Sequence, residues 1–258
     1  MIKHPLGNYL VAASFLALTV SPIHADSFLV VPNAQTSAVG NDNGGSLAGG
    51  PFDAQVQLDF GRGQFSSVPG DLLINQFAFR AAPGTGSMDV TDTSVSIYMS
   101  TSRYAPNTAG SNTLITSTFA NNLGPNNTLV FSRGPGTLFS SPGCAGPGPC
   151  PFDMVFNLST PFLYNPAQGF LLIDFQFTGF TGIGNGSFDI EDYDSPGGPV
   201  ATVENLDGGS PTTGVVQLSG NIVQFGFTAV PEPGSLALVT SVLGLLSLFA
   251  IIRRRQSS

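Results

Sequence analysis

The chain has 258 residues, with 8 Lys or Arg, 16 Asp or Glu and a formal net charge of −8. Proteins bind nucleic acid largely through Lys and Arg side chains that displace counterions from the phosphates. Because this chain is acidic and has few such side chains, we expect no nucleic-acid partner. Both histidines, His4 and His24, and the single lysine, Lys3, lie within the first 25 residues. Removal of that segment would leave no base for His-dependent catalysis, no amine for Schiff-base chemistry and no imidazole ligand for zinc. We therefore expect no enzyme activity, no catalytic residue and no cofactor.

Residues 1–25 have the order of a secretory signal peptide. Lys3 precedes an apolar run at residues 10–20, and small residues close the segment at Ala25. The apolar run is much shorter than the ~20 residues that a membrane span requires. We expect cleavage after Ala25 and export of the remaining chain. Residues 26–230 carry 15 acids against four arginines, a formal net charge of −11 that favours solubility.

Residues 26–51 are expected to form an N-terminal strand and a linker rich in Gly, Ser and Asn. Apolar and polar residues then alternate in short runs, most clearly in "FDMVFNLS" at residues 152–159. The predicted strands are 52–60, 72–80, 93–101, 127–132, 152–159, 170–179, 214–220 and 221–229. Gly/Pro/Ser clusters favour turns between them. The pattern predicts one all-β domain at residues 52–229, a β-sandwich or jelly roll with phenylalanine rings between its sheets.

Cys144 and Cys150 enclose the residues "AGPGP". In an exported protein, two cysteines so close in the sequence are expected to form a structural disulfide that closes a small loop. The alternative is a redox pair, but the spacing is not that of a C-x-x-C motif.

Carboxylates concentrate in "DIEDYD", where Asp189, Glu191, Asp192 and Asp194 lie within six residues. We expect a solvated acidic loop. A Ca²⁺ site is the alternative, although the segment lacks the glycine and terminal glutamate of an EF-hand loop.

Two further alternatives concern sugars. Glu191 and Glu204 could be the carboxylate pair of a glycosidase, which requires a separation of roughly 5–10 Å. Tyr164, beside Asn165 and Pro166, is expected to cover the core at a turn, and the alternative is an exposed ring that stacks on a sugar.

The C-terminal segment 230–258 differs from the rest of the chain. Residues 235–252 contain no charge and as a helix would extend roughly 27 Å, close to the ~30 Å hydrocarbon thickness of a bilayer. Arg253, Arg254 and Arg255 follow directly. We expect a transmembrane helix at 235–252 with this arginine cluster in the cytoplasm and the β-domain on the other side of the membrane.

The sequence "VPEPGSLAL", the apolar span and "RRR" together resemble the PEP-CTERM sorting signal of envelope proteins from Gram-negative bacteria that make exopolysaccharide. The resemblance covers residues 230–255. It implies that an exosortase recognises the motif at Val230, Pro231, Glu232 and Pro233 and cleaves near it, which would release the domain or transfer it to the cell surface. The domain also resembles others found ahead of this signal, in stretches such as "FDMVFNLSTPFLYNPAQGFLLIDFQF", and that resemblance implies no activity.

Two functions remain open. The first is a non-enzymatic structural or adhesive protein of the cell surface or extracellular matrix, in an envelope, biofilm or floc. The second is a module that binds extracellular polysaccharide, with or without calcium at residues 189–194.

Overall fold

The computed structural model describes residues 27–44, 53–92, 94–106, 115–179, 186–193, 198–206 and 212–230. The predicted cleavage site at Ala25, Asp194, and the segment 231–258 with Pro231, Glu232, Pro233 and the arginine cluster lie outside these residues. Within the described ranges, no helix has the length and apolar character needed to cross a membrane.

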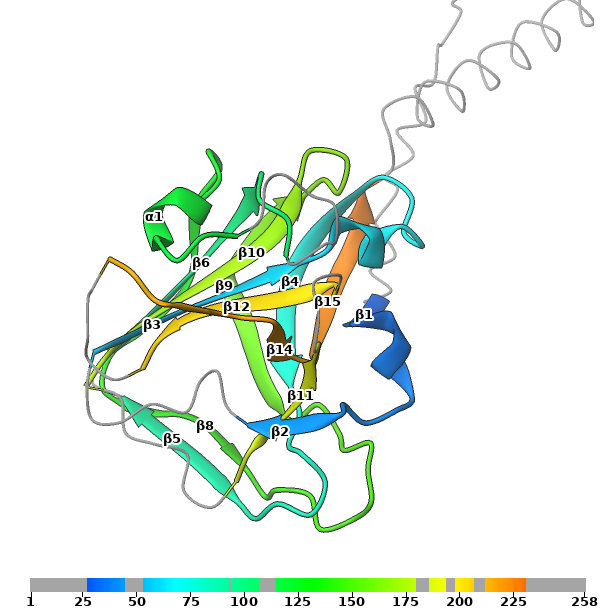
Figure 1. The fold of residues 1–258 in the computed structure, drawn as a ribbon, viewed down its shortest axis with the longest axis vertical. Coiled ribbons are helices and arrows are strands. Elements are labelled where there is room, and N and C mark those ends of the chain that lie inside the picture. The colour runs from blue at the N-terminus through cyan, green and yellow to red at the C-terminus, as the bar shows by residue number, and fades with distance from the viewer. Residues whose placement is uncertain are drawn as a thin grey trace, which may run out of the picture.

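The described chain is almost entirely β-structure, as the sequence predicts, and every strand pair is antiparallel. Two larger sheets form the body of the molecule, and in Figure 1 their strands cross one behind the other. The four-stranded sheet contains, in order, β1 (Ser27–Val31), β15 (Val223–Val230), β4 (Asp71–Phe79) and β9 (Met154–Tyr164). The six-stranded sheet contains, in order, β13 (Val215–Gln217), β12 (Val200–Asn205), β3 (Ala54–Phe60), β10 (Phe170–Thr178), β6 (Ser94–Ser102) and β7 (Thr128–Arg133).

In the described part of the chain, two smaller sheets and three short helices accompany the two larger sheets. The strands of the small sheets are β14 (Ser219–Asn221), β11 (Phe188–Asp192) and β2 (Asp42–Gly44) in one, and β5 (Met88–Asp92) and β8 (Gly136–Ser141) in the other. The helices are two 3-10 turns, η1 (Asn33–Thr36) and η2 (Arg62–Phe65), and one α-helical turn, α1 (Phe119–Asn122). Cys144 and Cys150 are joined in a disulfide, with their Cα atoms 6.0 Å apart.

Phenylalanine rings fill the space between the two larger sheets. The ring of Phe77 on β4 stacks on Phe156 of β9 at 4.8 Å between centroids and meets Phe175 of β10 edge-on at 5.9 Å. Phe60 of β3 meets Phe225 of β15 edge-on at 5.2 Å. The Phe77–Phe156 stack lies within the four-stranded sheet, whereas the Phe77–Phe175 and Phe60–Phe225 contacts join opposite sheets, because β3 and β10 belong to one sheet and β4, β9 and β15 to the other. The arrangement is consistent with a β-sandwich, in which inward side chains of two sheets interdigitate.

An irregularity in β4 keeps its large side chains in this core. Leu72 and Ile74 face the core in the first half of the strand, and Phe77 and Phe79 in the second half. Strict alternation would carry the first pair to positions 76 and 78, but the adjacent residues Phe227 and Gly226 of β15 pair with Ile74 and Gln76, so β4 contains one extra residue between these two. This extra residue changes which positions point inward, as β-bulges do.

The opposite face of the six-stranded sheet has a smaller core of its own. Leu172 of β10 and Ala201 and Val203 of β12 are buried there against Ile115 and Phe119. Phe119 begins α1, so this turn of helix and the segment before it cover the centre of the sheet. Consequently β12 is buried on both faces.

The six predicted runs before residue 214 each correspond to one strand. The predicted boundary at 220/221 falls inside β14, so 214–220 contributes β13 and the start of β14, and 221–229 contributes the end of β14 and then β15. β2, β5, β8, β11 and β12 have no counterpart among the predicted runs. β8 lies within the Gly/Pro/Ser cluster "GPGTLFSSPG" at 134–143, which favours turns, but Leu138 and Phe139 are buried and stabilise a strand there.

The expected linker also differs from the structure where the structure describes it. Residues 33–44 are folded against the domain: Asn33 donates two hydrogen bonds to Gln64, one from its backbone N–H to the side-chain oxygen and one from its side-chain amide to the carbonyl, and β2 pairs with β11. The polar composition of this segment predicted a linker, but its polar groups form hydrogen bonds with residues of the domain.

We expect Phe77→Ala to lower the free energy of unfolding by about 3–5 kcal/mol, because it removes a ring that contacts both sheets. Val155→Ala on the neighbouring strand, where the side chain is 40% exposed, should cost less than about 1 kcal/mol. Urea denaturation of both variants measures the difference. Equal losses would contradict a core centred on Phe77.

Candidate functional site

Several connecting segments meet at one end of the two larger sheets. They are residues 66–70 before β4, residues 123–127 before β7, residues 165–169 between β9 and β10, and the chain that leaves β6. The turn between β9 and β10 is at the top of Figure 1, on the same side as α1. Loops held by a rigid β-scaffold are common positions for binding sites.

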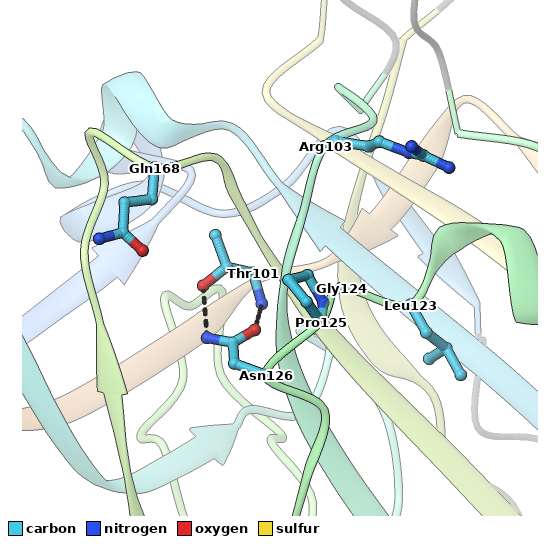
Figure 2. Close-up of a pocket in the computed structure, with 7 residues that line it drawn as sticks. All are labelled: Thr101, Arg103, Leu123, Gly124, Pro125, Asn126 and Gln168. Atoms are coloured by element: carbon cyan, nitrogen blue, oxygen red, sulfur yellow. Dashed lines mark hydrogen bonds between the residues drawn. The ribbon is translucent and has the colours of Figure 1, made fainter.

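One hollow among the described residues at this end has a volume of about 620 Å³ and is drawn in Figure 2. Gln168 contributes from the β9–β10 turn, on the opposite side of the hollow from Asn126 and the residues before it. The hollow is lined by Thr101, Arg103, Leu123, Gly124, Pro125, Asn126 and Gln168.

Two smaller hollows, of about 320 and 250 Å³, adjoin the first. The second shares Asn126 and Gln168 with the first, and it shares Asp71 and Asn165 with the third. The shared walls make the three hollows one row, which we call the end groove. The second hollow adds Thr128, Pro161, Phe162 and Leu163 to the lining, and the third adds Phe65, Ser66, Val68, Gly70, Pro166 and Ala167.

Asn126 is held in place by Thr101 at the end of β6. Its side-chain oxygen accepts a hydrogen bond from the Thr101 backbone N–H at 2.7 Å, and its amide nitrogen donates to the Thr101 hydroxyl at 3.0 Å (Figure 2). A carboxamide has two N–H donors and two acceptor lone pairs. Asn126 therefore keeps one donor and one acceptor site beyond those that fix its position.

Other polar side chains of the end groove are also available. The Asn165 side-chain oxygen accepts the Ala167 N–H at 2.8 Å, which fixes the turn, while its amide nitrogen has no partner among the described residues. Within the same ranges, the side chains of Asp71, Arg103 and Gln168 make no hydrogen bond, although the Arg103 guanidinium lies 5.2 Å from the Tyr104 ring centroid. The groove thus presents amide groups, one cation and one anion beside apolar surface.

Tyr164, the residue before this turn, does not line the groove. Its side chain is fully buried, its hydroxyl donates to the Gly169 carbonyl at 3.0 Å, and its ring packs edge-on against Phe65. Tyr164 therefore covers the core, as expected, and it cannot serve as an exposed sugar platform.

The acidic segment is not the solvated loop that the sequence suggested. Residues Phe188–Asp192 form β11, because Phe188 and Ile190 alternate into the core and direct Asp189 and Glu191 to the other face. Asp189 forms a buried ion pair with Arg80 at 2.7 Å and accepts the Gly40 N–H. Glu191 accepts hydrogen bonds from Gln35 and the Asn41 N–H.

These contacts bear on the calcium alternative. Asp189 and Glu191 already bind protein donors, and in the described part of the chain no three His, Cys, Asp or Glu side chains are grouped to hold a metal ion. Asp192 engages Asn41 through its backbone, and Asp194 is outside the described residues. The acids of β11 instead fix residues 35–41 against the domain.

Arg80 completes this attachment. Its guanidinium donates to the carbonyls of Gln35 and Ala38 as well as to Asp189, and it lies 5.0 Å from the Phe152 ring centroid. Burial raises the pKa of Asp189, and Arg80 offsets this only in part. One fully buried arginine therefore joins β4, β11 and the N-terminal segment.

The possible glycosidase pair is divided between sheets. Glu191 is on β11 of the three-stranded sheet, whereas Glu204 is on β12 of the six-stranded sheet and accepts a hydrogen bond from Gln217. Neither residue lines the end groove.

Two further buried carboxylates, Asp59 and Asp174, lie on the face of the six-stranded sheet opposite the main core. Burial raises the pKa of Asp59 well above its usual range, and among the described residues neither of its side-chain oxygens has a hydrogen-bond partner. Burial also raises the pKa of Asp174, although Gln55 and Gln176 donate to it. Because both side chains are enclosed, neither is positioned to exchange protons with a substrate in the end groove.

No protein-family model, curated protein or solved structure matches this chain. Of the residues that line the groove, Asn165 and Pro166 belong to the turn that the sequence predicts. The others come from separate segments that only the fold brings together.

We expect Arg80→Met to lower the free energy of unfolding by about 3–5 kcal/mol, because it leaves Asp189 buried without its cation. The double variant Arg80→Met/Asp189→Asn should lose less free energy of unfolding, because it leaves no buried charge without a partner. Urea denaturation at neutral pH compares the two. A single variant as stable as the original would show that the ion pair does not hold this region.

Asp59 should make stability depend on pH. Between its usual and its raised pKa, only the folded state keeps the proton, so the free energy of unfolding should fall as pH rises through that window. Asp59→Asn does not titrate and should flatten this decline, so that its advantage grows from acidic to neutral pH. Urea denaturation of both proteins at several pH values across that range measures this difference. If the free energies of unfolding of the two proteins changed in parallel with pH, Asp59 would not be the source of the decline.

Proposed function

We propose that this protein is an exported surface or matrix protein with a structural or adhesive, non-enzymatic role in an envelope, biofilm or floc. In this proposal a signal peptide ending at Ala25 directs export. The two larger sheets form a β-sandwich outside the cytoplasm, and a transmembrane helix at 235–252 holds the precursor in the membrane. An exosortase then processes the PEP-CTERM segment. The main support is the order of Pro-Glu-Pro, apolar span and arginine cluster at the end of the sequence.

The position of β15 also supports this proposal. Val230 ends β15 and is paired with Asp71 of β4, so the sheet extends to the residue directly before Pro231. Pro231 and Pro233 have no backbone N–H and cannot continue strand pairing. Cleavage within or after the motif would remove the tail and leave every described strand intact.

The chemistry of the domain supports a non-enzymatic role. Residues 26–230 contain no histidine and no lysine. Asp59, whose pKa burial raises well above its usual range, is enclosed, and Asp189 is paired with Arg80. The end groove favours a second function, polysaccharide binding.

The sorting proposal is tested with a triple variant, Pro231→Ala/Glu232→Ala/Pro233→Ala, in tagged protein expressed in cells that contain an exosortase. We expect the variant to stay in the membrane fraction at the mass of the unprocessed chain. The original protein should appear at the surface or in the medium with a smaller mass. Arg133→Ala, which changes a cation far from the motif in sequence, is the matched control.

Identical mass and distribution of the original and triple-variant proteins would refute recognition of the motif.

A further inference from the structure

We propose that the end groove binds a linear, uncharged polysaccharide. The ligand runs along the row of hollows, its hydroxyl groups bonded to the side chains of Asn126, Asn165 and Gln168 and its sugar rings packed on Leu163 and the neighbouring prolines. This inference names a ligand for the exported protein, and its test does not depend on how the protein is sorted.

The shape of the groove favours a chain over a small molecule. Sites for small molecules bury most of the ligand surface in one concave pocket. Here three hollows of about 620, 320 and 250 Å³ adjoin in a row through shared lining residues. A row of this kind suits a ligand made of repeated units, each unit occupying one hollow.

The polar groups of the groove suit hydroxyl groups. Each hydroxyl of a sugar is both a donor and an acceptor, and a carboxamide offers the same two functions side by side. The amides of Asn126 and Asn165 are already oriented by Thr101 and by the Ala167 N–H, so little side-chain entropy is lost when they bind. Gln168 lines the first two hollows, each of which it shares with Asn126.

Leu163 provides apolar surface in the middle hollow. Its side chain is 51% exposed, although large apolar side chains of β9 such as Phe156 and Phe162 are buried. Pro161 lies beside it in the same hollow. A sugar ring that covers Leu163 with its C–H face would remove this apolar surface from water.

Charge excludes an anionic polymer. The end groove contains one cation, Arg103, and one anion, Asp71, whereas residues 26–230 as a whole have a net charge of −11. A polyanion would find one favourable contact and a repulsive surface around it.

The prolines disfavour an extended peptide. Peptides that add to a sheet edge are held by backbone hydrogen bonds. Pro161 removes a donor from the edge strand β9, and Pro125 and Pro166 remove donors from the flanking loops. Recognition must therefore use side chains.

The test is native electrophoresis of the full chain, purified in detergent, through gels that contain galactomannan, dextran or mixed-linkage β-glucan. Alginate is the anionic comparison. We expect at least one neutral polymer to retard the protein and alginate to leave its mobility unchanged. Binding is then quantified from the retardation at several polymer concentrations.

Three variants connect binding to the groove. Leu163→Ala/Gln168→Ala should weaken binding about tenfold or more, as expected for loss of one apolar contact and one hydrogen bond. Asn165→Asp keeps the oxygen that fixes the turn but loses the amide donors, and it should also weaken binding. Leu129→Ala is the control, because Leu129 is exposed to a similar extent (43%) on β7 and does not line the groove. All variants should show the original unfolding midpoint.

Retardation by none of the neutral polymers would overturn the proposal, as would binding that the groove variants leave unchanged. Alginate binding that disappears in Arg103→Ala would assign the groove to anions instead, and displacement of the polymer by an extended peptide would assign it to peptides. Because the assay uses purified protein, a negative result leaves the sorting proposal untouched, and a failure of sorting leaves the groove result valid.

Discussion

The layer of phenylalanine rings between the two larger sheets is the constraint on which the rest of the structure depends. The chain contains no tryptophan and few charged residues, so hydrophobic burial by rings such as Phe77, Phe156 and Phe175 must hold the sheets together. This packing fixes the ends of the strands and therefore the positions at which the loops begin. The end groove forms because four of these segments begin close together at one end of the packed sheets.

Polar side chains have two separate roles around this core. Arg80, Asp189 and Glu191 connect the N-terminal segment to β4 and β11, and their hydrogen-bonding capacity is largely used for that purpose. The side-chain amides of Asn126 and Asn165 are different, because each retains donors or acceptors after its position is fixed. This division separates the residues that stabilise the domain from those that are free to meet a ligand.

Much of the fold could be predicted from strict alternation, which identified β9 and β10 because one face of each strand is apolar. Alternation identifies a strand only when one face is apolar and the other is polar and exposed. It therefore missed β12, which is buried on both faces, and β8, which lies among turn-forming residues. It also missed β11, whose apolar residues alternate with acids, one of which is buried in an ion pair with Arg80. The groove could not be predicted, since Asp71, Asn126 and Gln168 are far apart in sequence and only the fold brings them together.

The last described strand lies inside its sheet and not at an edge. β15 separates β1 from β4, so the first strand of the domain has no pairing partner until the last one has arrived. Long-range pairing of this kind makes folding slow and leaves the unpaired strands open to other chains. If the domain is exported as we propose, its first strand cannot pair while later segments are still entering the membrane. The four-stranded sheet would then be completed only after residue 230 had crossed, so any partner that binds the finished sheet would meet it after translocation.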